Sequence, residues 1–205
     1  MKDKRTHIIE TAMDLFARKG YEGTSIREIA ERASVNLAMV NYYFGSKEKL
    51  FENIVEYKSA VTRGLLDEIL NNDKLSSIEK IYSIIDSYVE KLFTHRSFHR
   101  LIYQELILNQ REELQNSIVN HLAPNSVIIK RIIETGIKNE EFKKVDVELT
   151  LASLMGTINQ VLLSKKFCNK IMNKADDYVP YDDIKFRKRV RNHLRQLMDA
   201  HLLNN

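Results

Sequence analysis

The sequence has few of the residues that interrupt helices or cross-link a chain. Two prolines and six glycines in 205 residues favour long helices over strands joined by tight turns. A single cysteine, Cys168, excludes an internal disulfide and fits a reducing cytoplasm. No apolar run approaches the roughly 18 residues of a membrane span, and the first residues hold no apolar signal-peptide core. These absences predict a cytoplasmic globular protein with no membrane partner.

A strong charge of one sign is also missing. The net charge is +4, and residues 1–49 hold nine Lys and Arg against seven Asp and Glu. A weakly basic domain binds DNA when its positive groups face one way, so this balance permits a polyanionic partner without requiring one. Apolar residues make up 43% of the chain and charged residues 29%, which is ordinary for a globular protein.

Apolar side chains recur at helical spacing in the first part of the chain. Residues 4–19 place Ile8, Ala12 and Leu15 on one face, and Gly20 follows as a helix stop. Polar side chains that accept hydrogen bonds from a helix start mark the next three helices. Those helices are expected to begin after Thr24 or Ser25, after Asn36 for about two turns, and after Ser46 as far as about Asn71.

The rest of the chain also predicts helices. Ser76 and Glu79 form a capping-box signature ahead of apolar residues at helical spacing. Pro124 can begin a helix but not continue one, and residues 169–181, with Pro180, form the one long loop. Further helices are expected over 97–109, 111–122, 125–138, 147–168 and 182–203. No hairpin signal interrupts this pattern, so the predicted fold is all-α.

Residues 8–51 resemble the N-terminal DNA-binding domain of the tetracycline-repressor (TetR) family. The matching pattern covers residues 16–21, 24–30 and 42–50. The resemblance is specific because residue types, order and spacing all agree. Residues 136–146 also resemble the turn that precedes the family's penultimate long helix.

The resemblance implies a helix-turn-helix DNA-binding domain over 1–49 and a larger helical ligand-binding and dimerisation domain over 50–205. Proteins of this family are homodimers that pair through their last two long helices. A small-molecule effector typically releases them from a palindromic, double-stranded DNA operator. The chain is therefore expected to be a transcriptional repressor, with activation left open. It is not expected to be an enzyme or to hold a cofactor.

The third expected helix is the one predicted to read DNA. Val40 and Phe44 share its core face, so the other side chains point away from the core. Apolar contacts with thymine methyl groups, and Asn41 at an adenine edge, explain why such a face would be exposed. The alternative is that Leu37 and Met39 pack on the first helix.

Two predicted helices carry a cation at their N-terminal end, where the helix dipole is already positive. Arg27 and Lys47 lie in the first turns of their helices, and a nearby phosphate would compensate for this placement. For Lys47 the alternative is a solvated lysine, at a cost of roughly a few tenths of a kcal/mol. The residues expected at DNA, of which the threonine, serine and tyrosines follow from the resemblance, are Thr24, Ser25, Arg27, Leu37, Ala38, Met39, Asn41, Tyr42, Tyr43 and Lys47.

Three positions depart from the family pattern. The family often has a polar or charged residue in place of Leu37 and an aromatic residue in place of Asn41. Specificity is therefore expected to rest on apolar contacts and on DNA shape. Ser34 replaces the common turn glycine, and this replacement costs strain if its φ is positive.

Polar and aromatic residues on apolar helices are the candidates for a ligand pocket, which is expected to be apolar or aromatic-rich. Core packing or a satisfied buried amide is the alternative for each of them. The candidates are Tyr82, Tyr88, Phe93, Phe98, Tyr103, Asn159 and Gln160, with Glu105 as a charged anchor.

Two further features have weaker implications. His95 and His99 have the spacing of metal ligands on one helix face, but Arg96 and Arg100 would repel a cation, and no metal site is expected. The tail 185–195 has six basic residues and no acidic ones. These cations are expected to be solvated or paired with the acidic loop before them, and a second DNA or membrane surface is the alternative.

A rival interpretation comes from another class of protein. The chain would then be a helical small-molecule-binding protein or an enzyme, and residues 24–51 would be only a packed three-helix cap. No arrangement of nucleophile, base and orienting group supports catalysis. An exposed surface of Tyr42, Tyr43 and Lys47 would argue against this rival.

Overall fold

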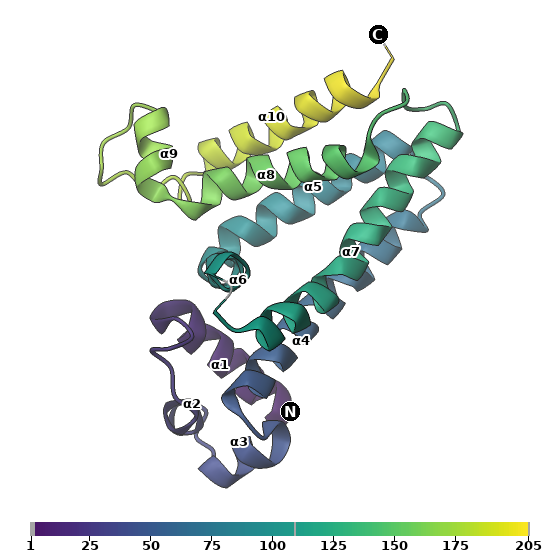
Figure 1. Ribbon diagram of the computed structural model, residues 1–205. Helices are drawn as coiled ribbons and strands as arrows, with labels where there is room; N and C mark the ends of the chain where they lie inside the picture. Colours follow the sequence, from purple (N-terminus) through teal and green to yellow (C-terminus); the bar gives the residue numbers. More distant parts are fainter. Residues whose placement is uncertain (1–2, 109, 205) are drawn as a thin grey trace. The chain divides into compact units, whose positions relative to one another are not determined.

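The computed structural model describes residues 3–108 and 110–204, and every regular element within them is an α-helix (Figure 1). The all-α prediction is confirmed. Residues 1–2, 109 and 205 belong to the predicted domains, and 109 also to a predicted helix; they lie outside the described residues. The helices are α1 (Lys4–Lys19), α2 (Ile26–Arg32), α3 (Leu37–Phe44), α4 (Lys47–Leu70), α5 (Ser77–Thr94), α6 (Arg96–Leu108), α7 (Glu112–Lys138), α8 (Val147–Leu163), α9 (Lys165–Ile171) and α10 (Ile184–Leu202).

The helices form two compact units, and each unit is built from two stretches of chain. The first unit is Met1–Thr62 with Ser97–Ala123, and the second is Arg63–Arg96 with Pro124–Asn205. The long helices α4 and α7 therefore supply residues to both units. The predicted domain boundary between residues 49 and 50 stays a prediction. No single helix of the described residues is long and apolar enough to cross a membrane; α8 and α9 pass that test only as a pair, bent by 96°.

Side-chain caps begin the helices of the first unit at the predicted residues. Ser25, Asn36 and Ser46 each accept a hydrogen bond from the backbone N–H three residues on, at 3.1, 3.1 and 3.2 Å. These bonds satisfy donors that a helix start leaves unpaired. Of the two candidate caps for α2, Ser25 is the cap. Thr24 is buried and donates its hydroxyl to the Gly20 carbonyl at 2.9 Å.

An aromatic cluster forms the core of the first unit. The Phe16 ring stacks on Tyr21 with 5.6 Å between centroids, and Phe51 meets both rings edge-on at 5.3 Å. α3 adds Val40 and Phe44 to the same core, and both are at most 5% exposed. Because these rings come from several elements, burying them fixes which face of α3 points to solvent.

The turn between α2 and α3 holds a serine in the left-handed conformation. Ser34 has a φ of +53°, and its N–H bonds to the Glu31 carbonyl at 3.1 Å. The N–H of Val35 bonds to the Ala30 carbonyl at 3.0 Å, which completes the Schellman pattern that closes a helix. Glycine adopts this backbone without a Cβ clash, so the strain anticipated at Ser34 is present.

Ser34→Gly is expected to raise the free energy of unfolding by about 0.5–1 kcal/mol. Removing the clash gains more than the added entropy of the unfolded chain costs. Urea denaturation followed by circular dichroism measures the change. Ser34→Ala keeps the clash and should leave stability nearly unchanged, and a less stable glycine variant would contradict the assignment of strain to this residue.

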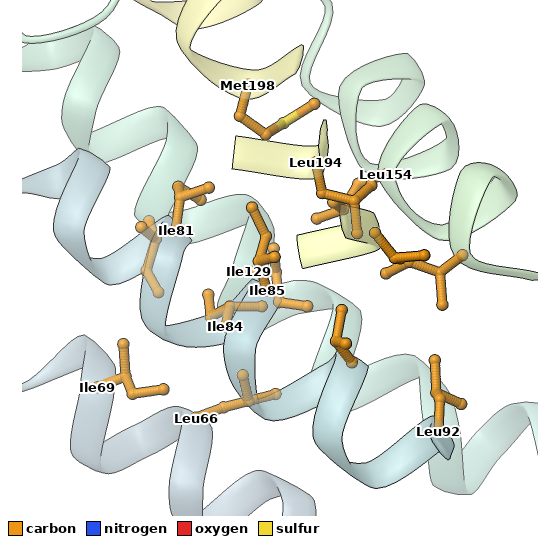
Figure 2. Packing of buried hydrophobic residues seen from close by; sticks show 14 of the residues in the cluster. Leu66, Ile69, Ile81, Ile84, Ile85, Leu92, Ile129, Leu154, Leu194 and Met198 are labelled. Atoms are coloured by element: carbon orange, nitrogen blue, oxygen red, sulfur yellow. The ribbon is translucent and has the colours of Figure 1, made fainter. Parts of the chain in front are cut away.

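The second unit is built around a larger aliphatic core. Its first helix, α5, begins with the predicted capping box, in which Ser76 and Glu79 hold each other's backbone N–H. α5, α8 and α10 lie side by side and bury their apolar faces against one another (Figure 1). Figure 2 labels members of this core: Leu66, Ile69, Ile81, Ile84, Ile85, Leu92, Ile129, Leu154, Leu194 and Met198.

The helix break predicted at Pro124 is wrong. The helices expected over 111–122 and 125–138 are one helix, α7, with the proline inside it. Proline lacks the N–H that bonds four residues back, and its ring crowds the carbonyl there. The carbonyl that loses its donor is that of Asn120; in the same turn, the carbonyl of His121 accepts a hydrogen bond from the Ser59 hydroxyl of α4. A tertiary contact therefore lies beside the proline in a helix that the local sequence predicts to end.

The single helix expected over 147–168 is also wrong, because the chain breaks at Ser164. This residue has an extended backbone, with φ −136° and ψ 107°, between α8 and α9. Its hydroxyl accepts a hydrogen bond from the Phe167 N–H at 3.2 Å and so caps α9. A serine within an apolar pattern acts here as a cap rather than as a helical residue.

Candidate nucleic-acid interface

α3 exposes the face opposite its core residues. Tyr42 is 85% exposed, and Leu37 and Tyr43 are 38% and 36% exposed, which is high for large apolar or aromatic side chains. Ala38 and Asn41 are exposed beside them. Leu37 and Asn41 are four residues apart and therefore share one side of the helix, and so do Ala38 and Tyr42. We call Leu37, Ala38, Asn41, Tyr42 and Tyr43 the α3 face.

Met39 and Leu37 differ with respect to the alternative that both pack on the first helix. Met39 is half-buried and packs against the core of the first unit. Leu37, two residues earlier, points to solvent. The packing alternative therefore describes Met39 and not Leu37.

The start of α2 places three further predicted residues. Ser25 and Arg27 are exposed. Thr24 is only 2% exposed, and its hydroxyl is directed to the Gly20 carbonyl. Thr24 therefore supports the loop between α1 and α2, whereas Ser25 and Arg27 are accessible at the helix start.

Lys47 begins α4 and lies over the ring of Tyr21. Its Nζ is 4.3 Å from the ring centroid, a cation–π contact of about 0.5–1 kcal/mol at an exposed site. Glu48 beside it accepts the Tyr21 hydroxyl at 2.9 Å. Its own backbone N–H, and then the hydroxyls of Ser46 and Tyr21, hold the pKa of the Glu48 carboxyl below its usual value. Glu48 thus already complements the helix dipole at the start of α4.

Arg111 joins this cluster from the residue before α7. Its guanidinium lies 4.4 Å from the Tyr21 ring centroid and pairs with Glu105 at 2.7 Å and with Glu22. Burial, followed by the hydrogen bond to Glu48, raises the pKa of Tyr21, which keeps the phenol neutral. Neither Tyr21 nor Arg111 is singled out by the sequence, because the two residues lie far apart in the chain and belong to no common motif.

Three of the predicted ligand residues lie on α6, in the first unit. Phe98 is buried in the aromatic core of that unit. Tyr103 is half-buried. Glu105 is the carboxylate that pairs with Arg111, and its side chain is 10% exposed. Its ion pair accounts for a buried charge without a ligand.

The other predicted ligand residues belong to the second unit. The Tyr82 hydroxyl donates to Asp199 of α10; burial, followed by this bond, raises the pKa of Tyr82 to about 12. Phe93 is buried against the rings of Tyr181 and Phe186, with centroids 6.3 and 6.1 Å away. Phe93 is therefore a core residue, and Tyr82 is linked to α10 by its hydrogen bond to Asp199.

Gln160 borders a cavity of the second unit. It is exposed at the edge of an apolar hollow of about 320 Å³ between α8, α9 and α10. Tyr88 and Asn159 are half-buried; Tyr88 packs against the aliphatic core. The sequence therefore identified one residue of this hollow, and the break at Ser164 that shapes it was not predicted.

The two histidines at metal-ligand spacing do not share a helix. His95 is the C-terminal cap residue of α5, and His99 lies in α6. Across residues 3–108 and 110–204, no group of three or more His, Cys, Asp or Glu side chains gathers closely enough to hold a metal ion.

Three arginines of the basic tail pair with carboxylates of α5. The prediction that they pair with the acidic loop before the tail is therefore wrong. Arg187, Arg191 and Arg195 follow one another four residues apart on one side of α10. Their guanidinium groups pair with Asp86 and Glu90 of α5 at distances from 2.5 to 3.8 Å. The sequence around the arginines does not predict this pairing, because the partners are about a hundred residues upstream.

Known protein families match both parts of the chain. The family described as bacterial regulatory proteins, tetR family, matches residues 8–54, and the tetracyclin repressor-like C-terminal domain matches residues 74–163. The probable HTH-type transcriptional regulator YttP of Bacillus subtilis is 28% identical over 83% of this chain and 81% of its own length. The HTH-type transcriptional repressor NicS of Pseudomonas putida is 29% identical over 74% of this chain and 71% of its own length.

Solved structures share the fold. A putative fatty acid metabolism regulator of Clostridium perfringens has a TM-score of 0.76 at 22% identity, covering 97% of this chain and 100% of its own. The regulator FadR of Bacillus subtilis, in complex with stearoyl-CoA, has a TM-score of 0.74 at 22% identity, covering 94% and 96%. The relatives are transcriptional regulators rather than enzymes. With both family models matched in chain order and an exposed helix-turn-helix surface, the chain belongs to the TetR family of DNA-binding transcriptional regulators.

Proposed function

We propose that this chain is a homodimeric repressor that a small-molecule effector releases from a palindromic operator. The exposure of the α3 face carries the proposal, above all the 85% exposure of Tyr42. A packed three-helix cap would bury such a tyrosine, whereas a recognition helix must leave it free for DNA. A repressor bound to chromosomal DNA works in the cytoplasm, the location expected from the sequence.

Within this proposal the residues divide into two kinds of DNA contact. Leu37, Ala38 and Asn41 read base edges in the major groove, through thymine methyl groups and an adenine edge. Four other exposed residues and the half-buried Lys47 hold the phosphate backbone, which fixes orientation and carries no sequence information. These phosphate-contacting residues are Ser25, Arg27, Tyr42, Tyr43 and Lys47. Thr24 and Met39, which are buried or half-buried, position the others.

The proposed dimer forms through α8 and α10. α8 leaves Leu149 65% exposed, and the small residues Ala152, Ser153 and Gly156 are exposed along the same helix. Small side chains let two helices approach closely, and a two-fold interface pairs the same surface on both copies. Light scattering of the purified chain is expected to give the mass of two copies, and a monomer at micromolar concentration would contradict this part of the proposal.

Asn41→Ala is expected to change which sequence is preferred rather than to abolish binding. An asparagine at an adenine edge contributes about 1–3 kcal/mol of discrimination at one base pair. Selection of bound duplexes from a random pool, followed by sequencing, measures this preference for the parent chain and the variant. Gln104→Ala, at an exposed position of α6, is the control and should reproduce the parent preference. An identical preference in the Asn41 variant would remove this residue from base reading.

The same selection tests the function itself. The proposal predicts a palindromic consensus, because two identical heads read two half-sites. A transcription assay with a promoter carrying that consensus then gives the sign of regulation, and added protein is expected to lower transcript yield. A pool with no enriched sequence would favour the rival, a helical binding protein without a DNA site.

A further inference from the structure

An arginine outside the helix-turn-helix is tied to the loop that leads into it. Arg111 directly precedes α7 and bonds to two carboxylates. One terminal nitrogen donates to Glu105 of α6 at 2.7 Å, and the other donates to Glu22 in the loop between α1 and α2. All three residues belong to the first unit. A single side chain therefore connects α6 to the loop that ends at Ser25, the cap of α2.

The α6 end of this connection is the fixed one. The side chain of Glu105 is 10% exposed and that of Arg111 is 22% exposed, whereas that of Glu22 is 79% exposed. A poorly hydrated carboxylate is costly without its partner, so Glu105 keeps the guanidinium in place. Because that group is planar and its donors are fixed in direction, the bond to Glu105 also aims the second nitrogen at Glu22. Arg111 therefore restrains the α1–α2 loop.

The ring of Tyr21 extends the connection to α4. The guanidinium carbon of Arg111 lies 4.4 Å from the ring centroid, and the Nζ of Lys47 lies 4.3 Å from the same centroid. Two cations beside one ring repel each other unless a nearby negative charge offsets one of them. Glu105 and Glu22 provide that charge for Arg111. These two carboxylates thus allow Lys47 to stay over Tyr21 at the start of α4.

The same carboxylates make Arg111 a poor ligand for a phosphate. Both of its terminal nitrogens already donate to a carboxylate oxygen, and a phosphate would have to displace Glu105 or Glu22. Any effect of Arg111 on DNA binding therefore passes through the residues that it holds.

We propose that Arg111 is a positioning residue for DNA binding, which acts by holding Lys47 and the start of α2 in place. The inference rests on the proposed function, in which Lys47 meets a phosphate. Its first test needs no DNA, so the inference and the proposed function can fail separately.

The position of Lys47 is measured by NMR on the full chain. Reductive dimethylation with isotope-labelled formaldehyde labels every lysine and keeps its charge, and a Lys47→Arg variant identifies the signal of this residue. Methyl groups over an aromatic ring are shifted upfield by the ring current. Arg111→Gln and Glu105→Gln should move the signal to the range of exposed lysines. Arg18→Gln is the matched control, because Arg18 pairs with Asp14 at 3.0 Å on the surface of the same unit, and it should leave the signal in place.

Affinity for the selected operator duplex, measured by fluorescence anisotropy, gives the consequence for DNA binding. Arg111→Gln should weaken binding about tenfold, the effect of losing one charge-assisted hydrogen bond. Arg111→Lys should weaken it as much, because an ammonium keeps the charge and lacks the planar fork. Lys47→Ala should cost less in the Arg111→Gln chain than in the parent, because the lysine is already displaced. Arg18→Gln should bind like the parent.

Glu105→Gln gives a change of opposite sign for the two explanations. It removes a negative charge, which by charge alone would tighten DNA binding. We expect weaker binding instead, because the uncompensated guanidinium repels Lys47 from the ring. The amide keeps an oxygen that accepts the hydrogen bond of Arg111, so this variant is expected to stay folded by circular dichroism.

Three results would overturn the positioning role. They are an unmoved Lys47 signal in folded Arg111→Gln and Glu105→Gln chains, tighter DNA binding by Glu105→Gln, and parent affinity in Arg111→Lys. A displaced signal with parent affinity in Arg111→Gln would also overturn it. The single Lys47→Ala variant then shows whether the lysine meets a phosphate at all, which tests the proposed function by itself.

Discussion

Replacing Tyr42 and Lys47 together with alanine is expected to weaken operator binding about 100-fold at physiological salt. A phosphate contact from an ammonium contributes about 1.5–3 kcal/mol and one from a neutral hydroxyl about 1 kcal/mol, and about 3 kcal/mol corresponds to roughly two powers of ten in affinity. The loss should be nearly the same on operator and on unrelated duplexes, because phosphate contacts carry no sequence information. Fluorescence anisotropy with labelled duplexes measures both.

The salt dependence of DNA binding distinguishes the contribution of Lys47 from that of Tyr42. Removing one lysine–phosphate contact lowers the slope of log affinity against log salt by about one, and removing the tyrosine leaves that slope unchanged. Lys49→Ala is the matched control, since Lys49 is an exposed lysine on α4 that pairs with Glu52 at 3.0 Å. If Lys47→Ala kept both the parent affinity and the parent slope, Lys47 would have no role at a phosphate.

Phe51→Ala is expected to lower the free energy of unfolding of the first unit by about 3–5 kcal/mol, the usual cost of removing a buried phenylalanine. Phe51 is fully buried and meets the rings of Phe16 and Tyr21 edge-on. The cavity left behind would loosen the packing that orients α3, so DNA binding should fall with stability. Urea denaturation monitored by circular dichroism measures the change.

Tyr57→Ala provides the comparison on the same helix. Tyr57 is 36% exposed and should cost no more than about 1 kcal/mol, because much of its surface is already in water. Equal stability losses in the Phe51 and Tyr57 variants would contradict the view that the aromatic cluster holds the first unit together.

Helix starts were predictable from the sequence because the interaction that makes a cap is local. Ser25, Asn36, Ser46 and Ser76 each bond a backbone N–H three residues away, so the relevant atoms lie within one turn. The prediction at Pro124 failed because its outcome depends on a contact between distant parts of the chain. Helix propensity gives the free-energy cost of a proline inside a helix, but it does not include the tertiary packing that can offset this cost.

The α3 face was predictable for a related reason. Helical periodicity assigns Val40 and Phe44 to the core, and their burial leaves Tyr42 and Asn41 outside. Periodicity says nothing about which distant group meets a given side chain. The contacts of Tyr21 with Arg111 therefore emerge only from the structure.

The residues predicted to bind a ligand show the same limit of prediction from sequence. Tyr82 and Phe93 are polar or aromatic residues on apolar helices, and such residues serve equally well in a core or in a pocket. Only packing distinguishes the two uses, and here it places both residues against α10 or its neighbours. The α8–α9 break at Ser164, which creates the apolar hollow, follows from a cap that the apolar pattern conceals.

Sequence-specific binding of operator DNA by the α3 face is the property on which the proposed function depends. Titration of the full chain against a palindromic duplex from the random pool, at several salt concentrations, tests it most directly. We expect a Kd in the nanomolar range at physiological salt, at least about a thousandfold tighter than for a scrambled duplex, with affinity falling linearly on a log–log plot against salt. Equal binding to the palindrome and to the scrambled duplex would contradict it.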